Sequence, residues 1–431
     1  MMNVVKRAIF AVCLLILLPA GAGAISLSLD QCIQRAMVAN PEIKAYQYAV
    51  QEAREGVGEA WGAFLPSVSV SYDHNRILNS SGQGTENDYF DQRSDRLVAR
   101  LSQPVFAGFR GLAGLKRARQ NESFRELELL LIRAELRRDV KIGFYDLLRA
   151  QALVEKRTES VERLRNQQEI AQAWVEKSLA PRIRLLEVQV ELSNARQAVI
   201  SAKAALATAM ARLEEMLGME SGFTPEIEGS LDEQAIEPCQ TVPACVDLGL
   251  ARRLELELGT LNIKMAHQEA RTILARNLPQ ARVDASWNDF QRDYETESLT
   301  DDVRDYYTVM FNVSISPFQG GRNIFAWRRQ QAAISRLENI LIQQRNGITT
   351  EIKSRFEQLN EGYARLETAE DTLKQAREAY DLTRHSVKLG VSSLRDLLDT
   401  QILLTEAQIN QIDSYHALQV ARAHLDFAVG N

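Results

Sequence analysis

The second half of this chain repeats the backbone punctuation of its first half. Pro104 recurs as Pro317 and Gly108 recurs as Gly321, at the same offset in both cases. Because proline and glycine restrict where a backbone can turn, their recurrence in register predicts two structurally equivalent halves. A chain of this kind must fold into an architecture in which one order of elements occurs twice.

The predicted repeats cover residues 25–219 and 244–431. Residues 220–243 between them carry six acidic side chains and no Lys or Arg, a composition typical of a linker. Ahead of the first repeat, residues 1–24 form a predicted secretory signal. Two basic residues there precede an apolar run of 11 residues and a small-residue triplet, so we expect cleavage after about Ala24.

Each half begins with helical periodicity, which in the first half covers residues 30–62 and is interrupted at Asn40-Pro41. Two segments with strict alternation of apolar and polar side chains follow in each half. Their apolar positions are Val68, Val70 and Tyr72; Leu97, Ala99 and Leu101; Val283, Ala285 and Trp287; and Val309, Phe311, Val313 and Ile315. Such segments of about 10 residues are predicted strands with one apolar face, long enough to cross a bilayer when tilted.

Long segments with helical composition follow the strands. We expect helices over residues 109–177, 183–217, 321–388 and 393–429. About 33 helical residues before the strands and about 35 after the break match the roughly 68 of the long helix, so two short helices can stack end to end beside one long helix. At about 1.5 Å per residue, the long helix is roughly 100 Å, beyond the core of a globular domain.

Four two-faced strands cannot close a barrel, and an open sheet edge in lipid leaves backbone groups unpaired at several kcal/mol each. The barrel is therefore expected to be shared between chains. Two chains supply 8 strands and three supply 12, both within the known range. The helices favour three chains, because 12 helical columns enclose a lumen on the order of 30 Å against about 15 Å for eight.

The duplicated order of helix, strand pair and helical hairpin resembles the TolC family of outer-membrane efflux and secretion channels over essentially the whole mature chain. Three local motifs carry the resemblance: LSQPVFAGFRG (101–111) and ISPFQGGRN (315–323) at the strand-to-helix crossing, and KLGVSSLRDLLDTQ (388–401) at a hairpin tip. The resemblance implies a mainly α fold with a small β part: a homotrimer with a 12-stranded outer-membrane barrel and a periplasmic tunnel of helical hairpins. It also implies a periplasmic adaptor and an inner-membrane transporter as partners.

At the crossing, proline and glycine have separate physical roles. Proline lacks a backbone donor and ends strand pairing, whereas glycine allows the steep turn into a helix. The residues expected to form the crossing are Pro104, Gly108, Pro317, Gly320 and Gly321.

Asp396 and Asp399 are three residues apart on a predicted helix and so share one face. Three symmetry copies would place six carboxylates around one axis, a ring that favours cations. The resemblance puts both positions at the family's periplasmic constriction, and the alternative is a pair of ordinary solvated charges. The matching positions of the first half are Arg184 and Glu187, so the internal symmetry is broken there.

The family's best-studied pattern also has a Tyr and an Arg that help to hold the tip shut, and Val387 and Ser392 occupy those positions here. The hairpin ends themselves carry small or apolar residues, expected to be exposed and suited to docking on an adaptor. Simple turn chemistry is the alternative explanation. These residues are Leu179, Ala180, Pro181, Gly390, Val391, Ser392 and Leu394.

Composition and motifs argue against other classes of protein. The chain has a net charge of −6 and no dense basic stripe, which disfavours nucleic-acid binding. Its five histidines form no ligand pattern and no nucleophile motif is present, so we expect neither an enzyme nor a cofactor. The main rival to a passive export channel is a periplasmic coiled-coil scaffold or adaptor without a pore, which would not need the strands.

Three cysteines follow the predicted signal. The short spacing of Cys239 and Cys245 in an exported protein suggests a local disulfide, which leaves Cys32 unpaired. Three free thiols are the alternative.

Overall fold

The computed structural model describes residues 26–80, 89–219, 226–232, 239–294 and 302–431. The predicted signal at residues 1–24 and part of the predicted linker lie outside the described residues. The chain divides into two compact units. One comprises the chain up to Ile43 with Arg133–Asp247 and Glu351–Asn431, and the other comprises Lys44–Ile132 and Leu248–Thr350.

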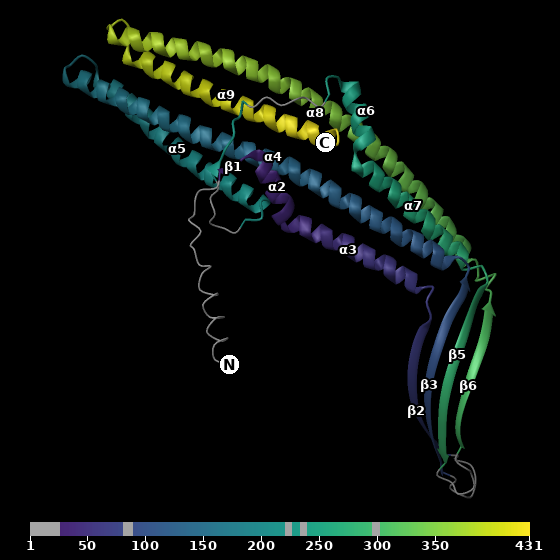
Figure 1. The fold of residues 1–431 in the computed structure, drawn as a ribbon. Coiled ribbons are helices and arrows are strands. Elements are labelled where there is room, and N and C mark those ends of the chain that lie inside the picture. Colours follow the sequence, from purple (N-terminus) through teal and green to yellow (C-terminus); the bar gives the residue numbers. More distant parts are fainter. Residues whose placement is uncertain (1–25, 81–88, 220–225, 233–238, 295–301) are drawn as a thin grey trace, which may run out of the picture. The chain divides into compact units, whose positions relative to one another are not determined.

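The helices of the two halves have equal lengths, as the internal repeat predicts. The long helices α4 and α8 have 67 residues each, and their hairpin partners α5 and α9 have 35 residues each (Figure 1). Each half also begins with a helix of 11 residues followed by one of 22 residues. The bounds are α2 Leu29–Ala39, α3 Pro41–Gly62, α4 Arg110–Glu176, α5 Arg182–Met216, α6 Val242–Arg252, α7 Leu254–Ala275, α8 Arg322–Lys388 and α9 Leu394–Ala428.

The predicted break at Asn40-Pro41 is confirmed, and Asn40 serves two helix ends there. Its side-chain oxygen accepts the backbone N–H of Glu42 at 2.8 Å, which caps the start of α3. Its amide donates to the carbonyl oxygen of Met216 at 3.0 Å, at the end of α5. The end of α5 therefore meets the end of α2, as expected if two short helices stack in line.

The four predicted strands form one antiparallel sheet in the order β2-β3-β5-β6 (Figure 1). Its strands are β2 Ser67–Ser80, β3 Tyr89–Ala107, β5 Gln280–Tyr294 and β6 Asp302–Ser314. With 13 to 19 residues, they are longer than expected from the sequence. Backbone pairing does not require two-faced side chains, so it continues where the alternation of the sequence has ended.

Strand register aligns the predicted apolar residues on one face of the sheet. Val68, Leu101, Ala285 and Val309 form one row across the four strands. Val68 and Val309 on the outer strands are 72% and 74% exposed. The opposite face buries polar side chains, including Asn288. The exposed face of the sheet is therefore apolar and its buried face is polar, which reverses the arrangement of a sheet in a water-soluble protein.

A β-bulge interrupts the pairing of β3 with β5. In the β3–β5 pairing, Pro104 lies opposite Arg282 and Phe106 opposite Ala281, so Val105 has no partner. The β5–β6 pairing has no such shift over its described register. The bulge leaves the offset between the halves unchanged, because Pro104 before it and Gly108 after it recur at the same offset. The offset becomes shorter by one only at the starts of α4 and α8.

The described part of the linker is ordered against the helices of the first unit. β4 (Glu226–Ile227) pairs in parallel with β1 (Ser26–Leu27). The side-chain amide of Gln419 donates to the carbonyl oxygen of Leu231 at 2.9 Å. The linker thus contacts α9 as well as the start of the chain.

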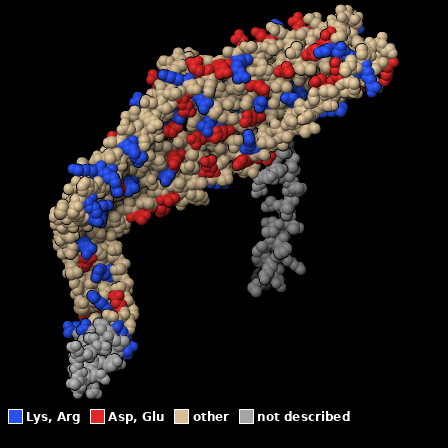
Figure 2. All heavy atoms as spheres, turned by 180° about the vertical axis from the view of Figure 1, so that it is seen from behind, with Lys and Arg blue, Asp and Glu red and all other residues tan. Residues whose placement is uncertain are grey.

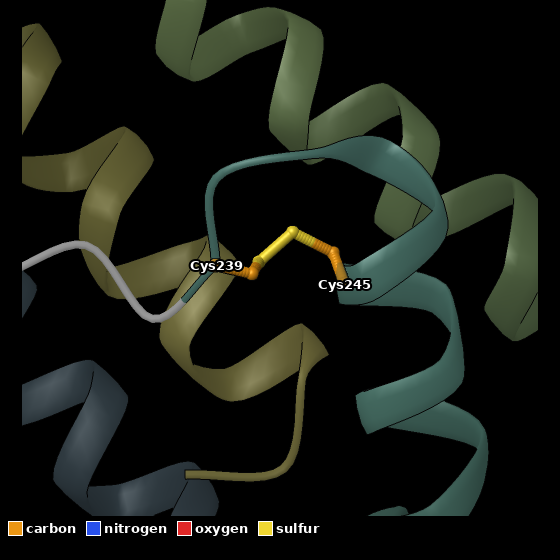
Figure 3. The surroundings of a disulfide bond; sticks show 2 residues. All are labelled: Cys239 and Cys245. Atoms are coloured by element: carbon orange, nitrogen blue, oxygen red, sulfur yellow. A yellow bond between two sulfur atoms is a disulfide. The ribbon is translucent and has the colours of Figure 1, made fainter.

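The cysteines have the arrangement favoured by the sequence. Cys239 and Cys245 are joined by a disulfide, with their Cα atoms 5.4 Å apart (Figure 3). Cys32 is free and fully buried in α2, and burial raises the pKa of its thiol to about 11.

Charged side chains of both signs are intermixed over the helices (Figure 2). In the described part of the chain, no helix is both long enough and apolar enough to traverse a bilayer.

Candidate functional site: the helical hairpin tips

Both hairpin tips begin with the same turn. At the end of α4, the N–H of Leu179 donates to the carbonyl oxygen of Trp174 at 2.7 Å. At the end of α8, the N–H of Val391 donates to the carbonyl oxygen of Ser386 at 2.9 Å. The residue before each donor is left-handed: Ser178 has φ 59° and Gly390 has φ 73°. Each tip therefore begins with a Schellman motif, with serine in the left-handed position of the first tip and glycine in that of the second.

The turn after α8 leads into a capping box that fixes Asp396. Ser393 Oγ accepts the N–H of Asp396 at 3.2 Å. The Asp396 carboxylate accepts the backbone N–H of Ser393 at 2.9 Å and its hydroxyl at 2.8 Å. The hydrogen bond from the backbone N–H of Ser393 is the main cause that lowers the pKa of Asp396 below its ordinary value, followed by the bond from the Ser393 hydroxyl. The charges of Arg184 and Arg395 lower this pKa as well.

Asp399 lies one turn further along α9 and is held more loosely. Its carboxylate is 3.9 Å from Nε of Arg395, and both side chains are 61% exposed. At such exposure, an ion pair contributes little to stability. Asp396 and Asp399 therefore share one exposed face of α9, as predicted.

The first half carries an ion pair where the second half carries the two aspartates. Arg184 Nη1 lies 2.9 Å from a carboxylate oxygen of Glu187 on α5. The two side chains balance each other's charge. Net negative charge is therefore concentrated on α9 rather than shared by both tips.

An apolar cluster beneath the tips joins both hairpins. It contains Val161, Leu164, Ala171, Val188, Leu192, Val387, Leu394, Leu397 and Leu398. Leu394 is only 4% exposed, so its assignment as an exposed docking residue was wrong. The i, i+3, i+4 spacing of Leu394, Leu397 and Leu398 places all three on the buried side of α9. Val387 is buried in the same cluster.

The other predicted docking residues lie at the hairpin ends. Leu179 is 68% exposed and Val391 is 80% exposed, whereas Ala180 and Ser392 are half-buried. Pro181 and Gly390 are exposed. Sequence reasoning overlooked exposed apolar neighbours in the same turns, Leu389 and Ile183.

Polar contacts between α4 and α9 also escaped sequence reasoning. Arg163 Nη2 donates to Thr405 Oγ1 and to Gln408 Oε1, each at 3.2 Å, and Gln167 donates to the carbonyl oxygen of Leu394 at 3.3 Å. Further along, His416 Nε2 lies 2.6 Å from a carboxylate oxygen of Asp146. No sequence pattern reveals these pairs, because their members come from opposite halves of the chain.

The crossing residues lie at the other ends of the long helices, in the second unit. Gly108 has φ 61°, and a Cβ there would lie 2.6 Å from the carbonyl oxygen of Ala275. Gly320 and Gly321 also have positive φ, 59° and 78°. Pro317 lies just beyond β6, as expected, but the expectation that Pro104 ends strand pairing was wrong. Pro104 lies at the bulge, and β3 continues to pair with β5 as far as Ala107, because the bulge absorbs the missing backbone donor.

No group of three or more His, Cys, Asp or Glu side chains that could hold a metal ion occurs within the described ranges.

Comparison with known proteins identifies relatives that span nearly the whole chain. The sequence profile of the outer membrane efflux protein family matches residues 32–219 and 246–431. The alkaline protease secretion protein AprF of Pseudomonas aeruginosa is 25% identical over 409 residues, 89% of this chain and 81% of AprF. The outer membrane efflux protein BepC of Brucella suis is 22% identical over 421 residues, 95% of this chain and 87% of BepC.

Among solved structures, a crystal structure of CusC, described as forming a transmembrane channel, matches with a TM-score of 0.80 at 15% sequence identity. The match covers 94% of this chain and 92% of CusC. At that identity, the likeness establishes the fold.

Proposed function

The chain belongs to the outer membrane efflux protein family, and from that membership we propose that three copies form one export channel. The strands of three chains close a 12-stranded barrel in the outer membrane, and the helical hairpins form a periplasmic tunnel. The channel is a passive exit duct and not an enzyme.

The observation that best supports the trimer is the sheet of this chain, which has an exposed apolar face and two open edges. β2 and β6 are the outer strands of the sheet formed by this chain. In lipid, each unpaired backbone group on those edges would cost several kcal/mol. Pairing β2 of one chain with β6 of the next satisfies both edges without any further element. Three chains are favoured over two, because eight helical columns leave a lumen of only about 15 Å.

We place the gate of this channel at Asp396 and Asp399. Their shared exposed face supports a ring of six carboxylates around the trimer axis. Such a ring attracts cations and resists anions. The seam between α4 and α9, with Arg163 and Gln167, would have to rearrange if the tip opens.

The partners are a periplasmic adaptor and an inner-membrane transporter. The exposed apolar side chains of Leu179 and Val391 at the two tips support docking of helical adaptor hairpins there. A Ser392→Cys variant that crosslinks to the cognate adaptor would support this assignment. Crosslinking only from a cysteine within α9, and not from Ser392→Cys in the turn before it, would count against it.

The organisation of the chain follows from the same proposal. A signal peptide at residues 1–24 would direct export, followed by repeats at 25–219 and 244–431 with the linker 220–243 between them. Equal helix lengths in the two halves support this division. So does the double match of the family profile, which ends at 219 and resumes at 246.

The rival reading, a periplasmic scaffold without a pore, leaves the apolar sheet face unexplained. The cargo is either small molecules or polypeptides. One relative is named for protease secretion and the other for efflux.

Purified trimer reconstituted in planar bilayers tests the channel directly. We expect single-channel conductance, together with heat-modifiable migration of the protein in outer-membrane fractions. Cysteines at Ser69 of β2 and Thr308 of β6, joined by a bifunctional maleimide, should yield covalent dimers and trimers, whereas either cysteine alone should yield no trimer. A monomer that stays in solution without detergent would refute the proposal.

A further inference from the structure

We propose that the inner wall of the barrel is an oxyanion-binding surface that favours cargo bearing carboxylate or phosphate groups. This inference rests on the proposed function, since it requires the sheet to close around a lumen. The polar face of the sheet then lines that lumen, because the apolar face meets lipid.

Strand register identifies the side chains on the polar face. Pairing places Asp73, Arg96, Phe290 and Arg304 in one row, and Ser69, Arg100, Ser286 and Thr308 in another. The charged residues that register places on this face are five arginines and three aspartates. They are Arg96, Arg100, Arg282, Arg292, Arg304, Asp73, Asp284 and Asp302.

This face has the opposite charge from the chain as a whole. The residues that register places on it carry a net charge of +2, whereas the whole chain carries −6. Three chains triple that excess around one lumen, and low-dielectric walls strengthen its field. A face that needed only to be polar could use Ser and Thr throughout, as it does at Ser67, Ser69 and Ser71.

Contacts within the face orient the arginines but do not remove the excess. Asp284 is buried and lies 3.0 Å from Arg282, so that pair is neutral. Arg96 donates to the uncharged amide oxygen of Asn288 at 3.3 Å. The guanidinium of Arg292 lies over the ring of Phe290, with its carbon 5.0 Å from the ring centroid. Because the net charge of the face already counts its three aspartates, pairing among these side chains leaves that charge unchanged.

The arginines are distributed along the strands rather than gathered at one end. Arg282 lies near the crossing, Arg100 lies further along, and Arg96 lies four residues beyond Arg100 on β3, about 13 Å at the rise of an extended strand. All the cations among these residues are arginines, whose planar fork matches carboxylate and phosphate oxygens in a bidentate manner. An anion could therefore pass from one ring of arginines to the next.

The test uses the trimer in planar bilayers, in a background in which Asp396→Asn and Asp399→Asn remove the proposed carboxylate ring. In a KCl gradient, the reversal potential should indicate anion selectivity. Citrate or pyrophosphate added from the barrel side should block the current. Adding Arg100→Gln and Arg304→Gln should abolish the anion selectivity and weaken block by about ten-fold, equivalent to one charge-assisted hydrogen bond.

Two further variants test whether the effect depends on the charge and shape of the arginine side chains rather than on general damage to the barrel. Arg93→Gln changes the same strand on the opposite face and should leave selectivity and block unchanged. Arg100→Lys with Arg304→Lys keeps the charge but loses the fork, so selectivity should persist while block weakens. Stronger block by pyrophosphate than by citrate would assign the wall to phosphate groups, and the reverse to carboxylates.

If conductance is normal but Arg100→Gln and Arg304→Gln change neither the ion selectivity nor the block, this inference is overturned and the channel proposal stands. Absence of conductance in every variant, the unaltered chain included, would overturn the channel itself.

Discussion

Asp396 and Asp399 lie one turn apart on the exposed face of α9, but only Asp396 is fixed by a cap, through its hydrogen bonds with Ser393. One carboxylate therefore combines a structural role with the proposed gating role, whereas the other is free to act in gating alone. This difference allows charge and helix capping to be tested separately.

Removing the charge of the proposed gate carboxylates should ease the passage of ions. We expect Asp396→Asn with Asp399→Asn to raise single-channel conductance and to weaken block by multivalent cations, because six negative charges leave the axis. Ser393→Ala, which removes the cap but keeps both carboxylates, is the control and should leave block intact. Unchanged current and block in the double variant would rule out a constriction at these residues.

The cap should make tip stability depend on pH in one direction. The bonds from Ser393 lower the pKa of Asp396 below 3.8 in the folded chain. The carboxylate therefore stabilises the fold above the unfolded pKa, and this contribution is lost as pH falls through the lowered value. Thermal unfolding in detergent should show a constant deficit for Asp396→Asn between pH 5 and 7 that narrows at about pH 4 and below. A deficit independent of pH down to about 3 would exclude this linkage.

Strain at the first tip can be relieved by the residue found at the second. Ser178 occupies the left-handed position that Gly390 occupies in the second half. A side chain there costs about 1 kcal/mol, so Ser178→Gly should raise the melting temperature of the trimer. Gly390→Ser is the matched control and should lower it by a similar amount. If the two melting temperatures shift in the directions opposite to these, or if neither of them shifts, backbone strain at Ser178 is contradicted.

Thiol chemistry should distinguish the cysteines by their environments. A buried Cys32 with a pKa raised to about 11 should resist alkylation at about pH 8 in the folded protein. In denaturant without reductant, the mature chain should take up one alkyl group by intact-mass measurement, and with reductant three. Three groups without reductant would show that Cys239 and Cys245 are unpaired.

Sequence patterns predicted the elements more successfully than their contacts. The four long helical segments matched within about two residues, since helical composition and the breaks at SLAPR and LGVSS are local signals. Strand lengths were underestimated, because pairing extends beyond the two-faced stretch. Leu394 was misplaced because a leucine directly after a turn looks exposed until the opposite hairpin covers it.

The sequence by itself determined the duplication, the order of helices and strands, and the two faces of the sheet. Each of these follows from glycine, proline and side-chain periodicity acting within a short stretch of chain. Only the tertiary structure decided that Val105 is a bulge, that Asp396 belongs to a cap, and that Arg163 meets Thr405 on a distant helix. Those outcomes depend on which segments become neighbours in space and on the conformations that their side chains adopt. A contact between two separate helices does not produce a periodic pattern in the sequence of either helix.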